Sequence, residues 1–379
     1  MATINEILEF SNNNLEEAEK IALNLIETKG KNFLLDLELI YSFQGKVEEA
    51  WEVCQELEKH FPDNPRVLFN KGWNIILQGD LLEGFKLMNR GREEQLWGNK
   101  PIQSIKPIWN GESLKGKHLL FYNEAGLGDE IVFVRFIKEI NKLGAKVILS
   151  CSPELAPIFA RIPEISAIVQ PEAMLGIYHD YWLPSMYSPV PLKIQFKDLS
   201  GKPYIKPNPE YVKKYYSIIN NDNKDKLKIG IRWLGREGDD YIGRIFPSEL
   251  LFESVNLPNT KVYSLQRDLD ERTDGLNKKA PDWIIDTSPF LKTWEDTIGI
   301  IANLDLVITS CTSIAHISAA MGKPTWVITP LMMYYIWCYP GNKTPWYDSV
   351  TLFRQEKYGS WKEPFENIKM KLKKRKLNA

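Results

Sequence analysis

The chain of 379 residues lacks much of what several common classes of protein require. Its four cysteines lie far apart and form no CxxC pair, which argues against a zinc ribbon or a disulfide scaffold and fits a reducing compartment. Its four histidines form no HxxxH pattern, which argues against a zinc hydrolase. The formal net charge is −1, so electrostatics give no reason to expect nucleic-acid binding.

Long apolar segments are also missing. The first residues lack the basic start and apolar centre of a signal peptide. The longest uncharged stretch, 324–342, contains prolines and a glycine, so we expect a buried strand and a loop there. We therefore expect a cytoplasmic protein with at most peripheral contact at the inner membrane face, made by the basic tail 369–376. The alternative for that tail is the solvated end of a terminal helix.

Residues 1–98 predict a helical repeat. Three four-residue segments look alike and end 32 and then 34 positions apart: 15–18, 47–50 and 81–84. That period is typical of tetratricopeptide repeats. In this register Gly72 and Gly84 fall on small-residue positions, whereas Glu38 stands where a small residue is expected. The alternative is a generic helical bundle. A repeat array predicts either a docking surface for a protein partner or a cap on the next domain.

After residue 115 strands and helices alternate, which predicts α/β structure with parallel sheets. We expect strands at 118–122, 146–151, 228–233, 261–265, 283–286, 306–309 and 325–329, and helices at 130–143, 153–161, 294–302 and 312–321. The proline-rich stretch 201–209 is typical of a linker, so we expect two facing Rossmann-like halves with the ligand between them. The predicted domains are 1–98, 99–205 and 206–379.

Three segments carry the candidate chemistry. In the first, Gly126 and Gly128 allow a close backbone approach to a ligand, and Asp129 lies at or near the start of a helix. The alternative for Asp129 is a capping role. The segment is not a GxGxxG fingerprint, so it supports classical NAD binding only weakly.

The second and third segments suit a diphosphate. Arg232 and Arg244 carry guanidinium groups, which match phosphate oxygens, although surface ion pairs are the alternative. Thr312 and Ser313 place hydroxyls at a predicted helix N-terminus, where anions bind. His316 follows one turn later and is either part of this site or a core residue.

At this point the chain resembles a family. Residues 124–129, followed by 132–135, are similar to a loop of glycosyltransferases of the ADP-heptose:lipopolysaccharide heptosyltransferase type, and most of all to their relatives with fused tetratricopeptide repeats. Further similar segments are 83–87, 109–111, 263–266, 304–309 with 312–316, 345–347 and 352–355. The resemblance runs from about residue 10 to the C-terminus. It implies a GT-B fold, a nucleotide-sugar donor held mainly by the C-terminal half, and no metal or other cofactor.

The resemblance also implies roles for single residues. Asp129 matches the base that deprotonates the acceptor hydroxyl. Further matches are Arg244 on the donor phosphates, Gln266 near the nucleoside, and Thr312, Ser313 and His316 in the diphosphate loop. On their chemistry alone, Gly128 and Arg232 complete the predicted donor site.

Two departures from the family leave the transferred sugar open. Cys311 stands where the family has an aspartate, and Tyr334-Tyr-Ile-Trp337 replaces Asp-Trp-Arg-Trp. We expect Cys311 to be a small packing residue, because no base is placed to activate its thiol. Asp268 and Asp270 form a DxD pattern, but the predicted fold argues against a metal there.

The prediction is thus an inverting, metal-independent glycosyltransferase. It moves a sugar from a nucleotide-diphosphate donor to a glycan, a lipid-linked acceptor or a protein. One alternative is a catalytically degenerate domain that acts with its repeats as a binding scaffold. Another is a different nucleotide-sugar enzyme of the same architecture, such as an epimerase.

Overall fold

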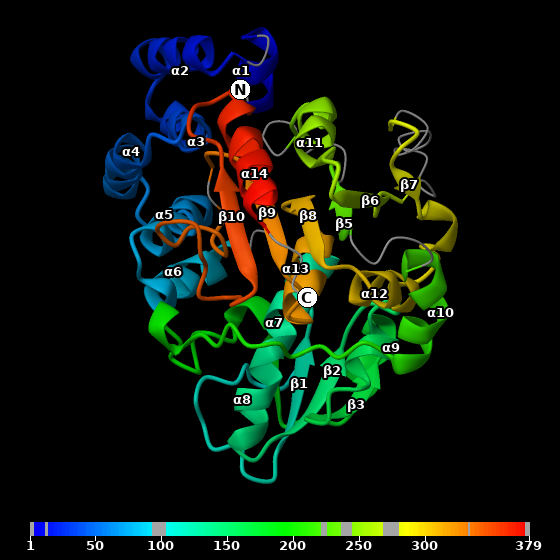
Figure 1. Cartoon of the computed structure of the whole chain (residues 1–379). Helices are drawn as coiled ribbons and strands as arrows, with labels where there is room; N and C mark the ends of the chain where they lie inside the picture. Colours follow the sequence, from blue (N-terminus) through cyan, green and yellow to red (C-terminus); the bar gives the residue numbers. More distant parts are fainter. Residues whose placement is uncertain are drawn as a thin grey trace.

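The chain is described from a computed structural model, which covers residues 4–11, 14–92, 104–220, 226–235, 245–267, 280–332 and 334–375. Within these ranges a group of helices comes first and two parallel sheets follow (Figure 1). None of the helices in this part of the chain is long and apolar enough to span a bilayer. All four cysteines are buried, and none of them forms a disulfide.

The N-terminal helices form an arc along one side of the molecule, beside the second sheet (Figure 1). They are α1 (Ile4–Phe10), α2 (Leu15–Lys29), α3 (Leu34–Gln44), α4 (Val47–His60), α5 (Pro65–Leu77) and α6 (Leu81–Met88), followed by the 3-10 turn η2 (Asn89–Arg92). Asn14, Asn64 and Asp80 cap α2, α5 and α6 by accepting backbone N–H groups. The helices predicted in this region are therefore confirmed.

Helices α5 and α6 approach each other closely at two glycines. A Cβ atom at Gly72 would lie 2.6 Å from the carbonyl oxygen of Gly84, and one at Gly84 would lie 2.6 Å from that of Gly72. Both glycines are therefore required by packing, as their small-residue positions predicted. Glu38, which breaks the pattern, is buried on α3 and accepts hydrogen bonds from Asn70 (2.7 Å) and Asn74 (2.8 Å) of α5.

The first sheet has the order β3-β2-β1-β4, with every neighbouring pair parallel. Its strands are β1 (His118–Tyr122), β2 (Lys146–Ser150), β3 (Ile165–Val169) and β4 (Tyr181–Pro184). The helix expected at 130–143 begins earlier, at Leu127, and consists of α7 (Leu127–Phe133), the turn η3 (Val134–Phe136) and α8 (Ile137–Lys142). Gly144 follows it with a φ of +92°, a left-handed conformation that favours glycine after a helix.

The second sheet has the order β10-β9-β8-β5-β6-β7, again all parallel. Its strands are β5 (Leu227–Arg232), β6 (Thr260–Ser264), β7 (Ile285–Asp286), β8 (Leu306–Ser310), β9 (Thr325–Thr329) and β10 (Val350–Arg354). Counted from β5, this is the order 3-2-1-4-5-6 of a doubly wound fold, and it reverses direction between β5 and β8. The prediction of α/β structure with parallel sheets is thus confirmed.

Several elements differ from the sequence-based expectation. Helix α12 (Trp294–Ala302) has the predicted bounds and α13 (Ser313–Ala320) nearly so, but the helix expected at 153–161 is reduced to α9 (Ala156–Phe159). Strands β3, β4 and β10 were not predicted, nor were α10 (Pro209–Asn220) and α11 (Ser248–Val255). Most of the basic tail forms the end of α14 (Lys362–Lys374), in agreement with the alternative prediction of a terminal helix. The predicted domain boundaries stay predictions.

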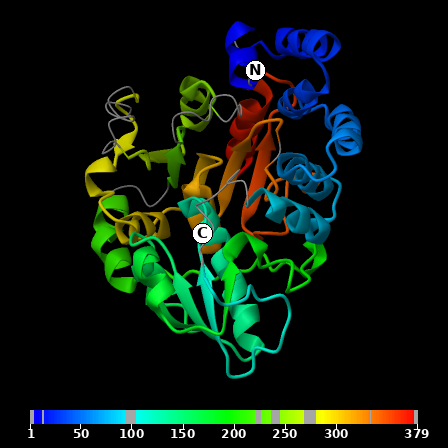
Figure 2. The same cartoon turned by 180° about the vertical axis from the view of Figure 1, so that it is seen from behind.

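One hydrophobic core runs through α5, α6 and both sheets, whereas α1, α2 and α3 pack around a separate cluster. In its aromatic part, the ring centroids of Phe85 and Phe133 lie 5.8 Å apart, and those of Phe133 and Tyr335 6.2 Å. The two views agree that the sheets lie one above the other, with α13 between them near the centre (Figures 1 and 2). Arg135 of η3 joins the halves by donating to the carbonyl oxygen of Trp346 (2.6 Å).

Candidate functional site

The predicted site loops follow strands at the points where each sheet reverses its order. Residues 123–126 follow β1, which lies between β2 and β4, and residues 233–235 follow β5, which lies between β6 and β8. Helix α13 begins directly after β8. In open parallel sheets, ligands bind beyond the carboxyl ends of strands at such reversal points. The topology therefore puts the predicted residues at the edges where a ligand is expected.

Asp129 is the third residue of α7, and Gly126 is the N-cap. Asp129 therefore lies near the N-cap, as expected, although the helix starts three residues earlier than predicted. The partly buried Asp129 carboxylate accepts hydrogen bonds through Oδ1 from the hydroxyls of Tyr334 (2.5 Å) and Tyr335 (3.0 Å). Burial raises the pKa of Asp129 above its ordinary value, while these hydroxyls and the Gly126 amide act in the opposite direction.

Gly128 lies at a point of close contact between the two halves. A Cβ atom at this position would lie 3.1 Å from Cδ2 of His316 and 3.8 Å from Cα of Ser313. A larger residue would therefore press on the first turn of α13. A Cβ at Gly235 would lie 3.3 Å from Cγ2 of Thr312, the N-cap of α13. The loops after β1 and β5 thus enclose the N-terminus of α13, where backbone N–H groups favour an anion.

His316 is held by aromatic neighbours. Its ring stacks on Trp337 with centroids 5.2 Å apart and an interplanar angle of 6°, and its Nδ1 lies 3.2 Å from the hydroxyl of Tyr347. The indole N–H of the same Trp337 donates to Sγ of the buried Cys311 (3.0 Å). The Cys311 sulfur therefore contributes to packing beside α13, and His316 is a buried residue that also faces Gly128.

Arg232 ends β5 with its guanidinium largely removed from solvent. Its Nη1 donates weakly to the carbonyl oxygen of Leu265 (3.4 Å), and its buried Nε has no hydrogen-bond partner among the described residues. Burial and the nearby positive charge of Arg267 lower the pKa of Arg232 to about 10. Two cations held this close favour an anionic ligand. Gln266, fully buried after β6, accepts from the Leu234 amide (3.2 Å) and so supports the loop that follows β5.

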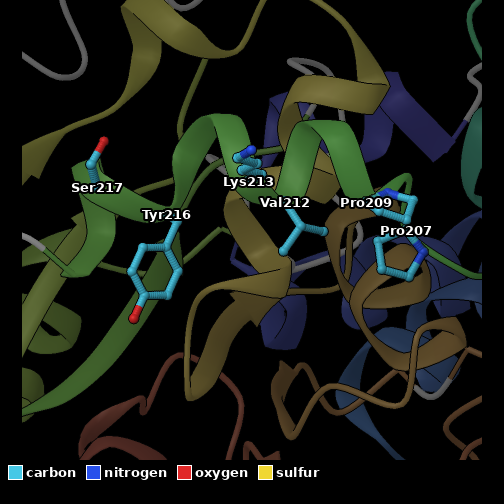
Figure 3. A pocket seen from close by; sticks show the side chains of 6 residues that line it. All are labelled: Pro207, Pro209, Val212, Lys213, Tyr216 and Ser217. Atoms are coloured by element: carbon cyan, nitrogen blue, oxygen red, sulfur yellow. The ribbon is translucent and has the colours of Figure 1, made fainter.

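Some predicted residues lie outside the described part of the chain. Arg244 is one of them, as are Asp268 and Asp270 of the DxD pattern. Within the described ranges, no group of three His, Cys, Asp or Glu side chains is arranged to hold a metal ion. A shallow hollow of about 510 Å³ lies along α10 and is lined by Pro207, Pro209, Val212, Lys213, Tyr216 and Ser217 (Figure 3). None of these residues belongs to the predicted site.

Sequence reasoning missed several residues of the site. Tyr334 and Tyr335 were noted only as a departure from a motif, yet both bind Asp129. Arg267 follows the predicted Gln266 directly but was assigned no role. The aromatic density of 334–347 was the available signal, because buried tyrosines need hydrogen-bond partners. Taken together, fold and site define an α/β protein with two halves, each built on a parallel sheet. The loops at the strand ends of both halves meet at the N-terminus of α13.

Comparisons with known proteins agree with this class. No family model matches the chain. Protein FlbA of Caulobacter vibrioides is 25% identical over 349 residues, which make up 84% of this chain and 57% of FlbA, so the chain spans less than two thirds of that relative. The solved structure of a glycosyl transferase of family 9 from Veillonella parvula aligns over 70% of this chain and 97% of its own, with 12% identity and a TM-score of 0.54. The E. coli ADP-heptose LPS heptosyltransferase II aligns over 68% and 99%, with 10% identity and a TM-score of 0.47.

The Veillonella structure establishes the fold. The two parallel sheets of this chain match those of a glycosyltransferase of the GT-B kind.

Proposed function

We propose that this chain is an inverting, metal-independent glycosyltransferase that takes a sugar from a nucleoside-diphosphate donor. The observation that carries the proposal is the contact between the start of α7, which holds Gly128 and Asp129, and His316 in the first turn of α13. Asp129 follows Gly128 directly in the chain, which supports a role beside the helix end that is proposed to bind the donor anion. The match in fold to a glycosyl transferase of family 9 supports the same reading.

Asp129 acts as the general base. The acceptor hydroxyl gives its proton to the Asp129 carboxylate while its oxygen forms a bond to the anomeric carbon of the sugar. The bond from that carbon to the diphosphate breaks, and the diphosphate leaves with the electron pair. Burial raises the pKa of Asp129, which makes its carboxylate a stronger base than an exposed one.

The second half holds the donor. The Arg232 guanidinium binds the diphosphate, which gains negative charge as it leaves. Thr312, Ser313 and the backbone N–H groups of the first turn of α13 bind the same phosphates. Arg244 is proposed to contact the donor phosphates as well, Gln266 the nucleoside and His316 the diphosphate loop. The charge of Arg232 and Arg267, rather than a metal, is proposed to offset that of the diphosphate.

The helical arc is proposed to be a tetratricopeptide-repeat module. The close packing of Gly72 on Gly84 supports this reading, because both residues lie on small positions of the repeat register. The module corresponds to the predicted domain 1–98 and precedes the acceptor-side domain 99–205 and the donor-side domain 206–379. The acceptor is a glycan, a lipid-linked sugar or a protein.

A thermal-shift panel with ADP, UDP, GDP, CMP and their sugar conjugates tests this function. A nucleotide at 100 times its dissociation constant adds about 2.7 kcal/mol of stability. We expect one base to stabilise the chain and Arg232→Ala to abolish that effect. If none of these nucleotides shifts the melting temperature, the degenerate binding scaffold is favoured. Two observations support that alternative: the Asp129 carboxylate is already hydrogen-bonded by Tyr334, and Cys311 is buried.

A further inference from the structure

The N-terminal helices contact the two tyrosines that bind Asp129. The ring of Trp73, on α5, lies 5.7 Å from that of Tyr334 and 5.6 Å from that of Tyr335, the second contact being edge-on. Phe85, on α6, meets the ring of Tyr335 edge-on at 5.4 Å. Edge-to-face aromatic contacts fix the orientation of the rings involved. Two helices from the start of the chain thus hold residues from near its end.

The tyrosine rings in turn fix the carboxylate. Tyr335 is fully buried, and its ring lies 4.3 Å from that of Tyr334. The hydroxyl oxygens of Tyr334 and Tyr335 lie 3.0 Å apart, and both hydroxyls donate to Oδ1 of Asp129. Among the described residues no further side chain donates a hydrogen bond to this carboxylate, whose remaining partners are the backbone N–H groups of Gly126 and Asp129. His316 of α13 faces the neighbouring Gly128. The orientation of Oδ1 therefore depends on where the two rings are held.

The helices themselves are anchored to the first α/β half. Arg92, at the end of η2, forms a buried two-pronged ion pair with Glu124, with Nε to Oε2 at 2.6 Å and Nη2 to Oε1 at 3.0 Å. Gln195 accepts from the first amide of α6, Leu81 N, at 3.0 Å and donates to its cap Asp80 at 2.9 Å. Glu124 lies in the loop that leads into α7, the helix that holds Asp129. Specific side-chain contacts therefore hold these helices against the candidate site, in addition to the covalent connection of the chain.

We propose that α5 and α6 are a positioning element of the candidate base, with Trp73 acting on Asp129 through Tyr334 and Tyr335. The base role of Asp129 rests on the function proposed above, whereas the positioning does not. The N-terminal helices are then part of the reaction centre in addition to any docking role they have. Trp73 is a positioning residue, because it touches the tyrosines and not the carboxylate.

The test is a carboxyl-carbon NMR titration of the full chain labelled with ¹³C at the aspartate side chains, with Asp129→Asn used to assign the Asp129 signal. In Trp73→Ala the tyrosines lose their support, and we expect the Asp129 pKa to rise by about one unit, a tenfold change in proton affinity, because hydrogen bonds to the charged form are lost. Trp73→Phe retains an aromatic ring and should restore the wild-type titration. Trp51→Ala, a tryptophan removal on α4 outside this aromatic contact, is the matched control and should leave it unchanged.

Each outcome decides the proposal. A titration of Trp73→Ala that matches the wild type would overturn it, as would an equal shift in Trp51→Ala. Should Trp73→Ala not fold, Tyr335→Phe removes one donated hydrogen bond without touching α5, and an unchanged Asp129 pKa in that variant would be equally damaging. Failure of the nucleotide panel on the wild type would remove the proposed function alone, since the titration uses no ligand.

Discussion

Replacing the buried Glu38 by glutamine should stabilise the N-terminal helices at neutral and alkaline pH. Burial raises the pKa of Glu38 from 4.5 to about 7, against hydrogen bonds from Asn74, Asn70 and Ser42. This shift corresponds to about 3 kcal/mol, at roughly 1.36 kcal/mol per pKa unit. Because the native state holds the proton more tightly than the unfolded chain, the stabilisation is complete below pH 4.5 and is lost as the pH rises to about 7.

Glutamine has the same shape but does not ionise, so Glu38→Gln should remove this pH dependence. Between pH 5 and pH 8 the wild type should lose roughly 2–3 kcal/mol relative to the variant, a change in the opening equilibrium on the order of 100-fold. Hydrogen exchange followed by mass spectrometry measures this locally, in peptides of α3 and α5, after correction for intrinsic exchange rates. A local readout is preferable because a chain of this size need not unfold in one step.

The control is Glu48→Gln, which removes an exposed carboxylate from the neighbouring α4. It should show the pH dependence of the wild type. Equal pH dependence in wild type and Glu38→Gln would refute the reasoning. It would mean that the amide donors of Asn70 and Asn74 stabilise the carboxylate as much as burial opposes it, so that Glu38 is charged throughout this range.

Three further substitutions test the site and its support. Asp129→Asn should lower turnover of the nucleotide sugar found by the panel by more than about a hundredfold with donor affinity retained; unchanged turnover would leave Asp129 a structural role in α7. Arg92→Met should destabilise the chain by about 3–5 kcal/mol in urea unfolding, because it strands the buried Glu124, and adding Glu124→Gln should recover much of the loss; no recovery would argue against a charge effect. Gly84→Ala should cost about 1–3 kcal/mol through overpacking against α5 in the same assay, and a neutral result would contradict the close approach of the two helices.

The elements that sequence patterns predicted best are those with the clearest local signal. Strands β1 and β9 and helix α12 have the predicted bounds, since apolar runs between turn residues or a capping threonine mark their ends. Strand β3 was missed because it is an edge strand with a half-exposed, irregular burial pattern. The predicted start of helix α7 is three residues too late, because Gly128, which disfavours helix, lies in its first turn.

For the candidate site too, the residues with a local sequence signal were predicted and those without one were not. Asp129, Gly128, Thr312, Ser313 and His316 were predicted from local motifs, and the topology brings their loops together. The partners of Asp129 were not predicted, because they lie about two hundred positions away and no pattern within either segment records that contact. Tertiary hydrogen bonds between distant segments leave no periodic trace in a single sequence.

The shared core has a consequence for synthesis on the ribosome. The apolar face of α5 and α6 is complete once Met88 has been made, but Tyr335, which covers part of it, is added about 250 residues later. At translation rates of roughly 5–20 residues per second, the part of that face that Tyr335 covers waits for about 12 to 50 seconds. During this interval an early-folding helical segment exposes aromatic side chains to other nascent chains and to chaperones. Production of this protein should therefore depend on chaperone supply and on translation speed between these two points.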